Sequence, residues 1–364
     1  MSETSVDRSA EAAIKLAVLR DVLDKTGAGA IRLRGVDWFA WSTAGGSNAV
    51  LLSQETGSAE LLVSRDDACI LTKDIEAARL KAEEVPPGFS FHATPWTEME
   101  VRERYVFEIA AGLPVLSDRP ANGELPLPPT LRQRRMVLGT GEIQRYRELG
   151  RAAAEAMSEA LRQAQPEWTE ARLAAAGAQA LVQRGLEPAL VLAAGERRLP
   201  LYRHPTPSQE RIGSRAMLRC CARRHGLYAS LARCISFGPA PAEQRELMAV
   251  EATGLAAIVP GGSLSAVYFA LEQGYRHANR PDAIKAHHQG GITGYASREI
   301  VATPVTAAEL ETGMAFAFNP SFEGLTIEDT FVLGPKGLEN LTCDPAWPAR
   351  DEQGRMRPLW LEAT

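Results

Sequence analysis

The sequence feature that most constrains the fold is a histidine-glycine loop followed, about 40 residues later, by an acidic residue in an apolar run. The loop covers His287–Gly291 and the run covers Ile327–Thr330. Paired glycines fit a tight loop at a strand edge, where the backbone approaches its neighbours closely. A carboxylate in an apolar strand is costly to bury alone, so Glu328 should have a partner, for which His288 and Arg219 are suited.

Composition excludes several classes of function. The chain has 364 residues, which predicts two domains, and its 45% hydrophobic and 23% charged residues are typical of a globular protein. The net charge of −5 gives no general attraction to nucleic acid or anionic membranes, and no apolar run is long enough to span a bilayer. The five cysteines lack zinc-like spacing, and the polar segment 1–10 has no apolar signal core. We therefore expect a cytoplasmic protein with no nucleic-acid or membrane partner.

The first part of the chain predicts a mixed α/β unit. Predicted helices cover residues 11–25, 73–84 and 97–112, and predicted strands cover residues 30–33, 38–42, 49–53, 60–64, 68–72 and 89–92. Residues 113–130 are rich in proline and predict a linker. This pattern predicts domains 1–135 and 136–364.

The second part predicts helix pairs packed on an antiparallel sheet, which is an α+β domain. Predicted helices cover residues 141–165, 169–185, 242–258 and 263–278, and predicted strands cover residues 216–222, 226–237, 314–319 and 325–333. The first two of these strands are close enough in sequence to form a hairpin.

Three motifs in this order resemble the pita-bread superfamily of aminopeptidase P, prolidase, methionine aminopeptidase and creatinase. They are the His-x-x-Gly-Gly loop, the strand from Gly313-Met314 to Pro320, and the Glu328-Asp329 strand. Residues 34–41 also resemble the N-terminal domain of the creatinase and aminopeptidase P branch. The resemblance implies a C-terminal pita-bread catalytic domain preceded by a smaller α/β creatinase-like N-terminal domain, and a homodimer.

The resemblance also implies where metal ligands would lie. Metal-dependent members bind two divalent ions through two aspartates, one histidine and two glutamates. The matching residues are Arg219, Ser230, His288, Asn319 and Glu328. Two possible ligands remain, and a guanidinium that cannot be deprotonated repels cations. We therefore expect no metal and no cofactor.

Creatinase provides the family precedent for catalysis without metal. Its catalytic histidine, two residues before a proline, is matched by His204 with the proline displaced by one residue. The resemblance implies that His204 acts as general base and then general acid, while His288 and Glu328 orient or polarise the substrate. The glutamate that holds creatine is matched by Ala232, so creatine itself is not the expected substrate. The expected substrate-binding residues are Arg203, Arg219, Ser230, Asn319, Tyr295 and Arg298.

The predicted function is a metal-independent hydrolase of an amide, amidine or peptide-like C–N bond in a small or dipeptide-like anionic substrate. A lyase that uses the same histidine is an alternative. Two further alternatives are an inactive binding protein of the same fold and a metal-dependent Xaa-Pro peptidase with altered ligands. Cys220 should face away from Arg219 on the same strand, which favours an inert thiol.

Overall fold

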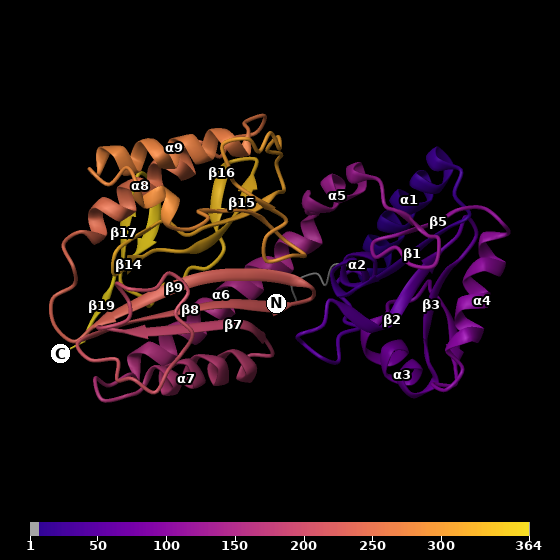
Figure 1. The fold of residues 1–364 in the computed structure, drawn as a ribbon, viewed down its shortest axis with the longest axis horizontal. Coiled ribbons are helices and arrows are strands. Elements are labelled where there is room, and N and C mark those ends of the chain that lie inside the picture. Colours follow the sequence, from indigo (N-terminus) through magenta and orange to yellow (C-terminus); the bar gives the residue numbers. More distant parts are fainter. Residues whose placement is uncertain (1–6, 364) are drawn as a thin grey trace. The chain divides into compact units, whose positions relative to one another are not determined.

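The computed structural model describes residues 7–363, so residues 1–6 of the polar N-terminal segment lie outside the described part (Figure 1). The chain divides into two compact units, Met1–Arg135 and Met136–Thr364. Within residues 7–363, none of the helices combines the length and apolar character needed to cross a bilayer.

The first unit contains a six-stranded sheet in the order β4-β3-β2-β1-β5-β6. Its strands are β1 Ala30–Gly35, β2 Thr56–Val63, β3 Ala68–Lys73, β4 Ser90–Thr94, β5 Val115–Ser117 and β6 Leu125–Pro126. Its helices are α1 Arg8–Thr26, α2 Val36–Ser42, α3 Asp74–Arg79, the π-helical turn η1 Leu80–Glu84, α4 Met99–Ala110 and α5 Pro129–Met136. The sheet is mixed, because β1 pairs antiparallel with β2 and parallel with β5.

Three predictions for the first unit are wrong. Residues 38–42 lie in helix α2 and not in a strand. The prediction failed because a short apolar run such as Trp38–Trp41 fits a buried helix as well as a buried strand. Residues 49–53 form bends and turns rather than a strand. The predicted linker contributes β5 and β6, and Pro126 is tolerated because β6 is the sheet edge, where a missing N–H breaks no ladder.

The second unit contains two main sheets. The first has the order β19-β9-β8-β7, and the second has the order β11-β10-β12-β15-β16. The strands of the first are β7 Glu187–Gly195, β8 Arg215–Arg224, β9 Leu227–Ser236 and β19 Leu361–Glu362. Those of the second are β10 Gly290–Thr293, β11 Ile300–Val301, β12 Ala315–Phe318, β15 Asp329–Gly334 and β16 Gly337–Asn340. Two small hairpins, β13 Ser321–Phe322 with β14 Leu325–Thr326 and β17 Ala349–Glu352 with β18 Arg355–Pro358, complete the unit.

Two helix pairs cover these sheets. Helices α6 Thr140–Arg162 and α7 Glu170–Gln183 lie along β7–β9, and α8 Gln244–Ala256 and α9 Leu264–His277 lie near the second sheet (Figure 1). The short 3-10 helix η2 Ala283–Ala286 follows α9. The predicted helices of this unit are therefore confirmed within a few residues, whereas β7 was not predicted.

The hairpin β8–β9 is confirmed and has a two-residue turn. His225 and Gly226 both have positive φ, at 53° and 77°, which is the backbone geometry that matches the twist of a tight hairpin. The pairing places Arg219 opposite Ala232 and Cys221 opposite Ser230. Cross-strand partners share a face of the sheet, so Arg219 and Ser230 project to the same side.

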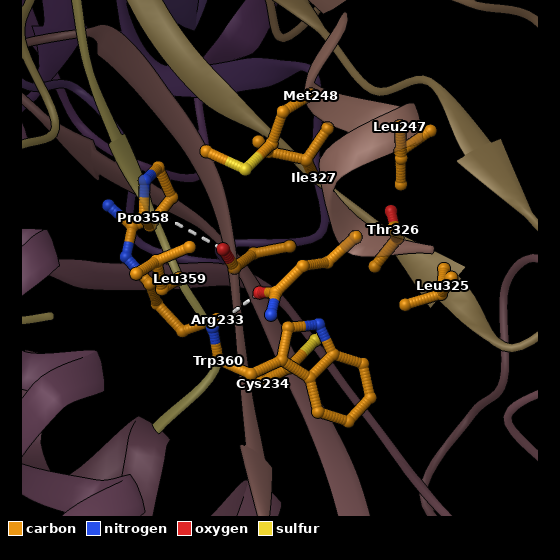
Figure 2. Close-up of a pocket in the computed structure, with 12 residues that line it drawn as sticks. Arg233, Cys234, Leu247, Met248, Leu325, Thr326, Ile327, Pro358, Leu359 and Trp360 are labelled. Carbon is orange, nitrogen blue, oxygen red and sulfur yellow. Dashed lines mark hydrogen bonds between the residues drawn. The ribbon is translucent and has the colours of Figure 1, made fainter. Parts of the chain in front are cut away.

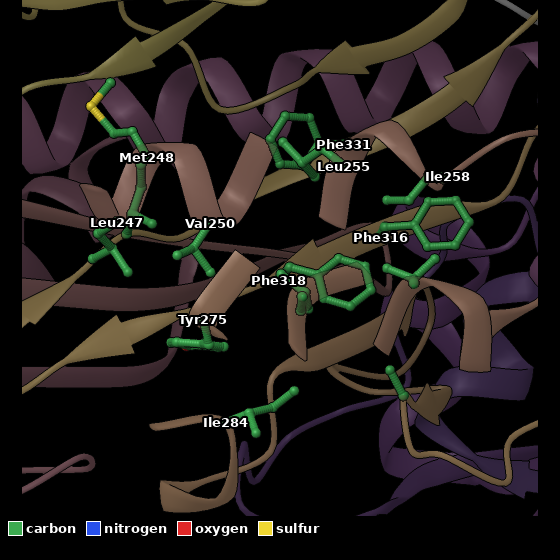
Figure 3. Close-up of a cluster of buried hydrophobic side chains, with 14 of the residues drawn as sticks. Leu247, Met248, Val250, Leu255, Ile258, Tyr275, Ile284, Phe316, Phe318 and Phe331 are labelled. Carbon is green, nitrogen blue, oxygen red and sulfur yellow. The ribbon is translucent and has the colours of Figure 1, made fainter. Parts of the chain in front are cut away.

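The hydrophobic core of the second unit fixes the ends of the strands that carry the candidate site. Figure 3 shows Phe316 and Phe318 of β12 and Phe331 of β15 with Leu255 of α8, all members of one buried cluster. Strands β12 and β15 are antiparallel, with Phe318 opposite Asp329. The end of β12 and the start of β15 are therefore neighbours.

Candidate functional site

The centre of the candidate site is a buried carboxylate held by two arginines. Glu328 directly precedes β15 and its side chain is 3% exposed. One of its oxygens, Oε2, lies 3.1 Å from Nε of Arg219, and the other, Oε1, accepts a hydrogen bond of 2.9 Å from Arg298. Glu328 thus has the charged partner that its apolar surroundings require.

Arg219 is fixed from several directions. Its side chain is 6% exposed, and Nη2 donates a 2.6 Å hydrogen bond to Oγ1 of Thr326 on β14. The amide of Ala232, its cross-strand neighbour, donates to the carbonyl oxygen of Glu328 at 3.0 Å. The guanidinium therefore points into the site and away from bulk water.

Three histidine rings lie close together. The ring centroids of His204 and His288 are 5.9 Å apart with an angle of 27° between the planes, and that of His287 is 6.4 Å from His204. His204 lies in the loop after β7, and the other two lie between η2 and β10. His204 and His288 are residues with exposed surface, so a ligand from solvent can reach them.

The surroundings keep these imidazoles neutral near pH 7. The pKa of His204 is lowered, mainly by partial burial of the ring and to a smaller extent by the positive charge of Arg219. The pKa of His288 is also lowered, mainly by partial burial and to a smaller extent by the positive charge of Arg298. Burial also lowers the pKa of His287 to about 4. A neutral imidazole has a free nitrogen lone pair, which is what a general base requires.

His287 and Ser321 were not among the residues predicted for the site. Nδ1 of His287 donates to the carbonyl oxygen of His288 at 2.6 Å, and Nε2 lies 2.7 Å from Oγ of Ser321. His287 and Ser321 are 34 residues apart. His287 begins the histidine-glycine loop of the sequence, but nothing in the sequence pointed to Ser321.

Two residues at the implied metal-ligand positions have other neighbours. The backbone amide of Ser230 donates to Thr330 at 2.8 Å, and its hydroxyl donates to Sγ of Cys221 at 3.3 Å. Asn319 is buried at the end of β12, and within the described chain its Oδ1 has no hydrogen-bond partner. An orphaned buried amide oxygen is available to a ligand donor.

The remaining predicted residues divide into two groups. Arg203 donates to the carbonyl oxygen of Phe322 at 2.6 Å and lines a cavity with Arg219 and His287. Tyr295 is not brought into this cluster, because its buried hydroxyl donates to Glu142 of α6 at 2.7 Å. That contact gives Tyr295 a packing role at the start of α6, where the prediction had it binding substrate.

The cavity that contains Arg203 and Arg219 is small, and a second, largely apolar cavity adjoins it. Leu325 and Thr326 line both cavities. Figure 2 shows Cys234 of β9, Met248 of α8 and Trp360 from the C-terminal segment around the second cavity.

The cysteines on β8 do not provide a nucleophile. Burial raises the pKa of Cys220 well above its ordinary value and that of Cys221 to about 11. Both thiols are therefore protonated at neutral pH, and a thiol is far less nucleophilic than a thiolate.

The residues at this site do not fit a dinuclear metal centre. Both oxygens of Glu328 face arginines, and Arg219 places a fixed positive charge beside this carboxylate. At an effective dielectric constant of about 20, a unit charge about 4 Å from a divalent ion costs several kcal/mol. Within residues 7–363, no group of three or more His, Cys, Asp or Glu side chains is arranged to hold a metal ion.

Comparison with known proteins identifies the fold. The model of metallopeptidase family M24 matches residues 144–335, and no curated protein matches the chain in sequence. The dipeptidase PepE from Mycobacterium ulcerans is 20% identical with a TM-score of 0.74, and the match covers 92% of this chain and 96% of that one. The prolidase from Pyrococcus horikoshii OT3 is 16% identical with a TM-score of 0.76, covering 91% and 98%.

Two further structures are similar over most of the chain. The X-Pro aminopeptidase from Thermotoga maritima MSB8 is 16% identical with a TM-score of 0.75, covering 95% of this chain and 99% of that one. The N-terminal domain of the FACT complex subunit SPT16 from Cicer arietinum is 12% identical with a TM-score of 0.70, covering 92% and 96%. The predicted α+β class and the resemblance to the pita-bread fold are confirmed.

Proposed function

Because the chain belongs to metallopeptidase family M24 but has arginines around the carboxylate of Glu328, we propose that it hydrolyses a C–N bond without a metal, in a small anionic substrate. The observation that carries this proposal is the position of Glu328 between Arg219 and Arg298. The coarser function, a peptidase-type hydrolase, agrees with the family.

The charge of the site favours an anionic substrate. Arg203, Arg219 and Arg298 contribute three positive charges, Glu328 contributes one negative charge, and the three neighbouring histidines are neutral. A carboxylate that binds one of these guanidinium groups can accept two parallel hydrogen bonds from it. We assign this role to Arg219 and Arg203, because both line the same cavity.

His204 is the proposed general base. Its ring is exposed and neutral, so it can take a proton from water as the water attacks an amide or amidine carbon. The protonated ring then returns the proton to the leaving nitrogen. His288 lies beside His204 and orients the substrate, and the free Oδ1 of Asn319 accepts a hydrogen bond from a substrate N–H group.

A binding protein without catalytic activity is the second candidate. It is favoured by the closed arrangement of Glu328, whose two oxygens are both engaged by protein groups, and by the bond from the Ser230 hydroxyl to Cys221. A similar fold also occurs in a subunit of the FACT complex. The third alternative, a metal-dependent Xaa-Pro peptidase, agrees with the family and with the prolidase-like structures but requires ligands that the site does not present.

The test is a screen of N-acyl amino acids, dipeptides and amidino acids with chelator-treated protein. The proposal predicts hydrolysis that survives chelation and falls about 100-fold or more in His204→Ala. His277→Ala, a change of an exposed histidine on α9, is the matched control and should keep full activity. Hydrolysis that His204→Ala leaves unchanged contradicts the role of His204, and substrate binding without turnover favours the binding protein.

The homodimer implied by the resemblance remains a proposal. Light scattering of the purified protein measures it directly, and a mass of one chain would contradict it.

A further inference from the structure

Ser321 and His287 form a hydrogen-bonded pair with defined proton positions. The carbonyl oxygen of His288 can only accept a hydrogen bond, so the proton of the neutral His287 ring lies on Nδ1. Nε2 is then the acceptor, and the Ser321 hydroxyl must donate to it across 2.7 Å. A serine hydroxyl that donates to an imidazole held in this tautomer is the arrangement of an activated nucleophile.

The two partners are held rigidly by one pair of buried side chains. The amide of Ser321 donates to the hydroxyl of Tyr275 at 2.9 Å, and that hydroxyl donates to Gln289 at 2.8 Å. The side-chain amide of Gln289 donates in turn to the carbonyl oxygen of His287 at 2.9 Å. Serine and histidine are therefore positioned by the same hydrogen-bonded network, which limits their relative motion.

The pair opens onto the cationic cavity. Ser321 and His287 line this cavity together with Arg203 and Arg219. Ser321 pairs across the β13–β14 hairpin with Thr326, the residue that receives the hydrogen bond of Arg219. A carbonyl group that reaches Ser321 shares this cavity with the guanidinium groups of Arg203 and Arg219, and such positive charge can stabilise a developing oxyanion.

We infer that Ser321 is a nucleophile activated by His287, and that this cavity forms an acyl-enzyme with small esters or activated amides. The inference uses the cationic cavity of the proposed function. Its nucleophile and base are Ser321 and His287 rather than water and His204, so the activity goes beyond the one proposed above.

The reaction has an acylation step and a deacylation step. Oγ of Ser321 bonds to the acyl carbon while its proton moves to Nε2 of His287, and the carbonyl electron pair moves to the oxygen. The bond from this carbon to the leaving nitrogen or oxygen then breaks, and the leaving atom takes the proton from Nε2. Water adds to the resulting ester and gives its proton to Nε2. The bond from the acyl carbon to Oγ breaks as Oγ recovers that proton, leaving a carboxylic acid and an amine or alcohol.

The arginines favour anionic substrates. Arg203 and Arg219 place two guanidinium groups on the wall of the cavity that Ser321 lines, and a guanidinium can bind a carboxylate through two parallel hydrogen bonds. The cavity therefore favours acyl compounds that carry a carboxylate.

The test is covalent labelling with methanesulfonyl fluoride, a small sulfonylating probe, followed by peptide mass mapping of the wild-type protein. The inference predicts one modification, at Ser321, with a rate that falls about 100-fold in His287→Gln. Ser321→Ala should abolish it, and Ser297→Ala, a change of an exposed serine in the nearby loop, should not.

Two outcomes overturn the inference: no modification of the wild-type protein, or modification at a residue other than Ser321. The wild-type map needs no variant, so it decides the matter even if Ser321→Ala fails to fold. His204→Ala separates the two proposals, because it should keep the labelling while it removes hydrolysis of the unactivated amides and amidines in the screen. Labelling without hydrolysis supports the serine nucleophile and contradicts the proposed function.

Discussion

Removal of the Arg219 guanidinium tests the ion pairs around Glu328. In Arg219→Met the aliphatic part of the side chain is retained, while the 3.1 Å ion pair with Glu328 and the hydrogen bond to Thr326 are lost. Loss of one partner from a buried ion pair costs about 3–5 kcal/mol. Glu328 keeps Arg298 at 2.9 Å, so we expect the lower value, a decrease of about 3 kcal/mol in the free energy of unfolding.

The assay is denaturant unfolding in a double-mutant cycle with Glu328→Gln. Hydrogen exchange of the amides in β8 and β15 assigns the measured transition to this unit. The pairing predicts a coupling energy of about 1–3 kcal/mol, because Arg219→Met costs less once Glu328 carries no charge. The control is Arg276→Met in the exposed Glu272–Arg276 pair on α9, which should change stability by less than about 1 kcal/mol. If the effects of Arg219→Met and Glu328→Gln on the free energy of unfolding are additive, the ion pair between these residues does not stabilise the fold.

Three further predictions concern pH, the core and anion binding. The folded pKa of His287, about 4, lies below the unfolded value of 6.5, so the unfolded chain binds more protons and stability falls as pH drops through this window. The loss in the free energy of unfolding approaches about 3 kcal/mol for the wild-type protein. Melting curves of His287→Gln over the same pH range should show a smaller loss, and equal losses in the two proteins would contradict this prediction. Phe316→Ala in the buried core of β12 should cost about 3–5 kcal/mol in denaturant unfolding, and a cost below about 1 kcal/mol would show that the ring is not packed as described. Arg203→Met should weaken the binding of a small carboxylate at least 10-fold by calorimetry, and unchanged binding would remove Arg203 from the anion site.

Local patterns in the sequence predict part of the structure correctly. The β8–β9 hairpin follows from two β-rich runs with a short turn between them, and the structure places that turn at His225 and Gly226. The burial of Glu328 follows from the apolar residues around it, and the requirement for a partner follows from its charge. His288 and Arg219 were the two expected partners, and the structure pairs Glu328 with Arg219 and adds Arg298.

Other parts depend on contacts between residues distant in sequence. The run at 38–41 is apolar enough for either a helix or a buried strand, and its packing in the first unit decides for the helix. The bond between Tyr295 and Glu142 joins residues 153 positions apart, so the sequence gives no sign that this tyrosine belongs to the packing around α6. Ser321 and His287 are also distant in sequence, 34 residues apart, so the sequence does not show that they form a pair. A serine after a proline has many structural roles, so Ser321 does not stand out by itself.

If arginines have replaced the requirement for metal at this site, the purified protein should hold no metal there. The decisive measurement is metal analysis of protein purified without chelator, together with calorimetric titration with Mn²⁺ and Zn²⁺. We expect well under one ion per chain and no saturable binding at the site, unchanged in Glu328→Gln. Two ions per chain in the purified wild-type protein, lost in Glu328→Gln, would contradict it.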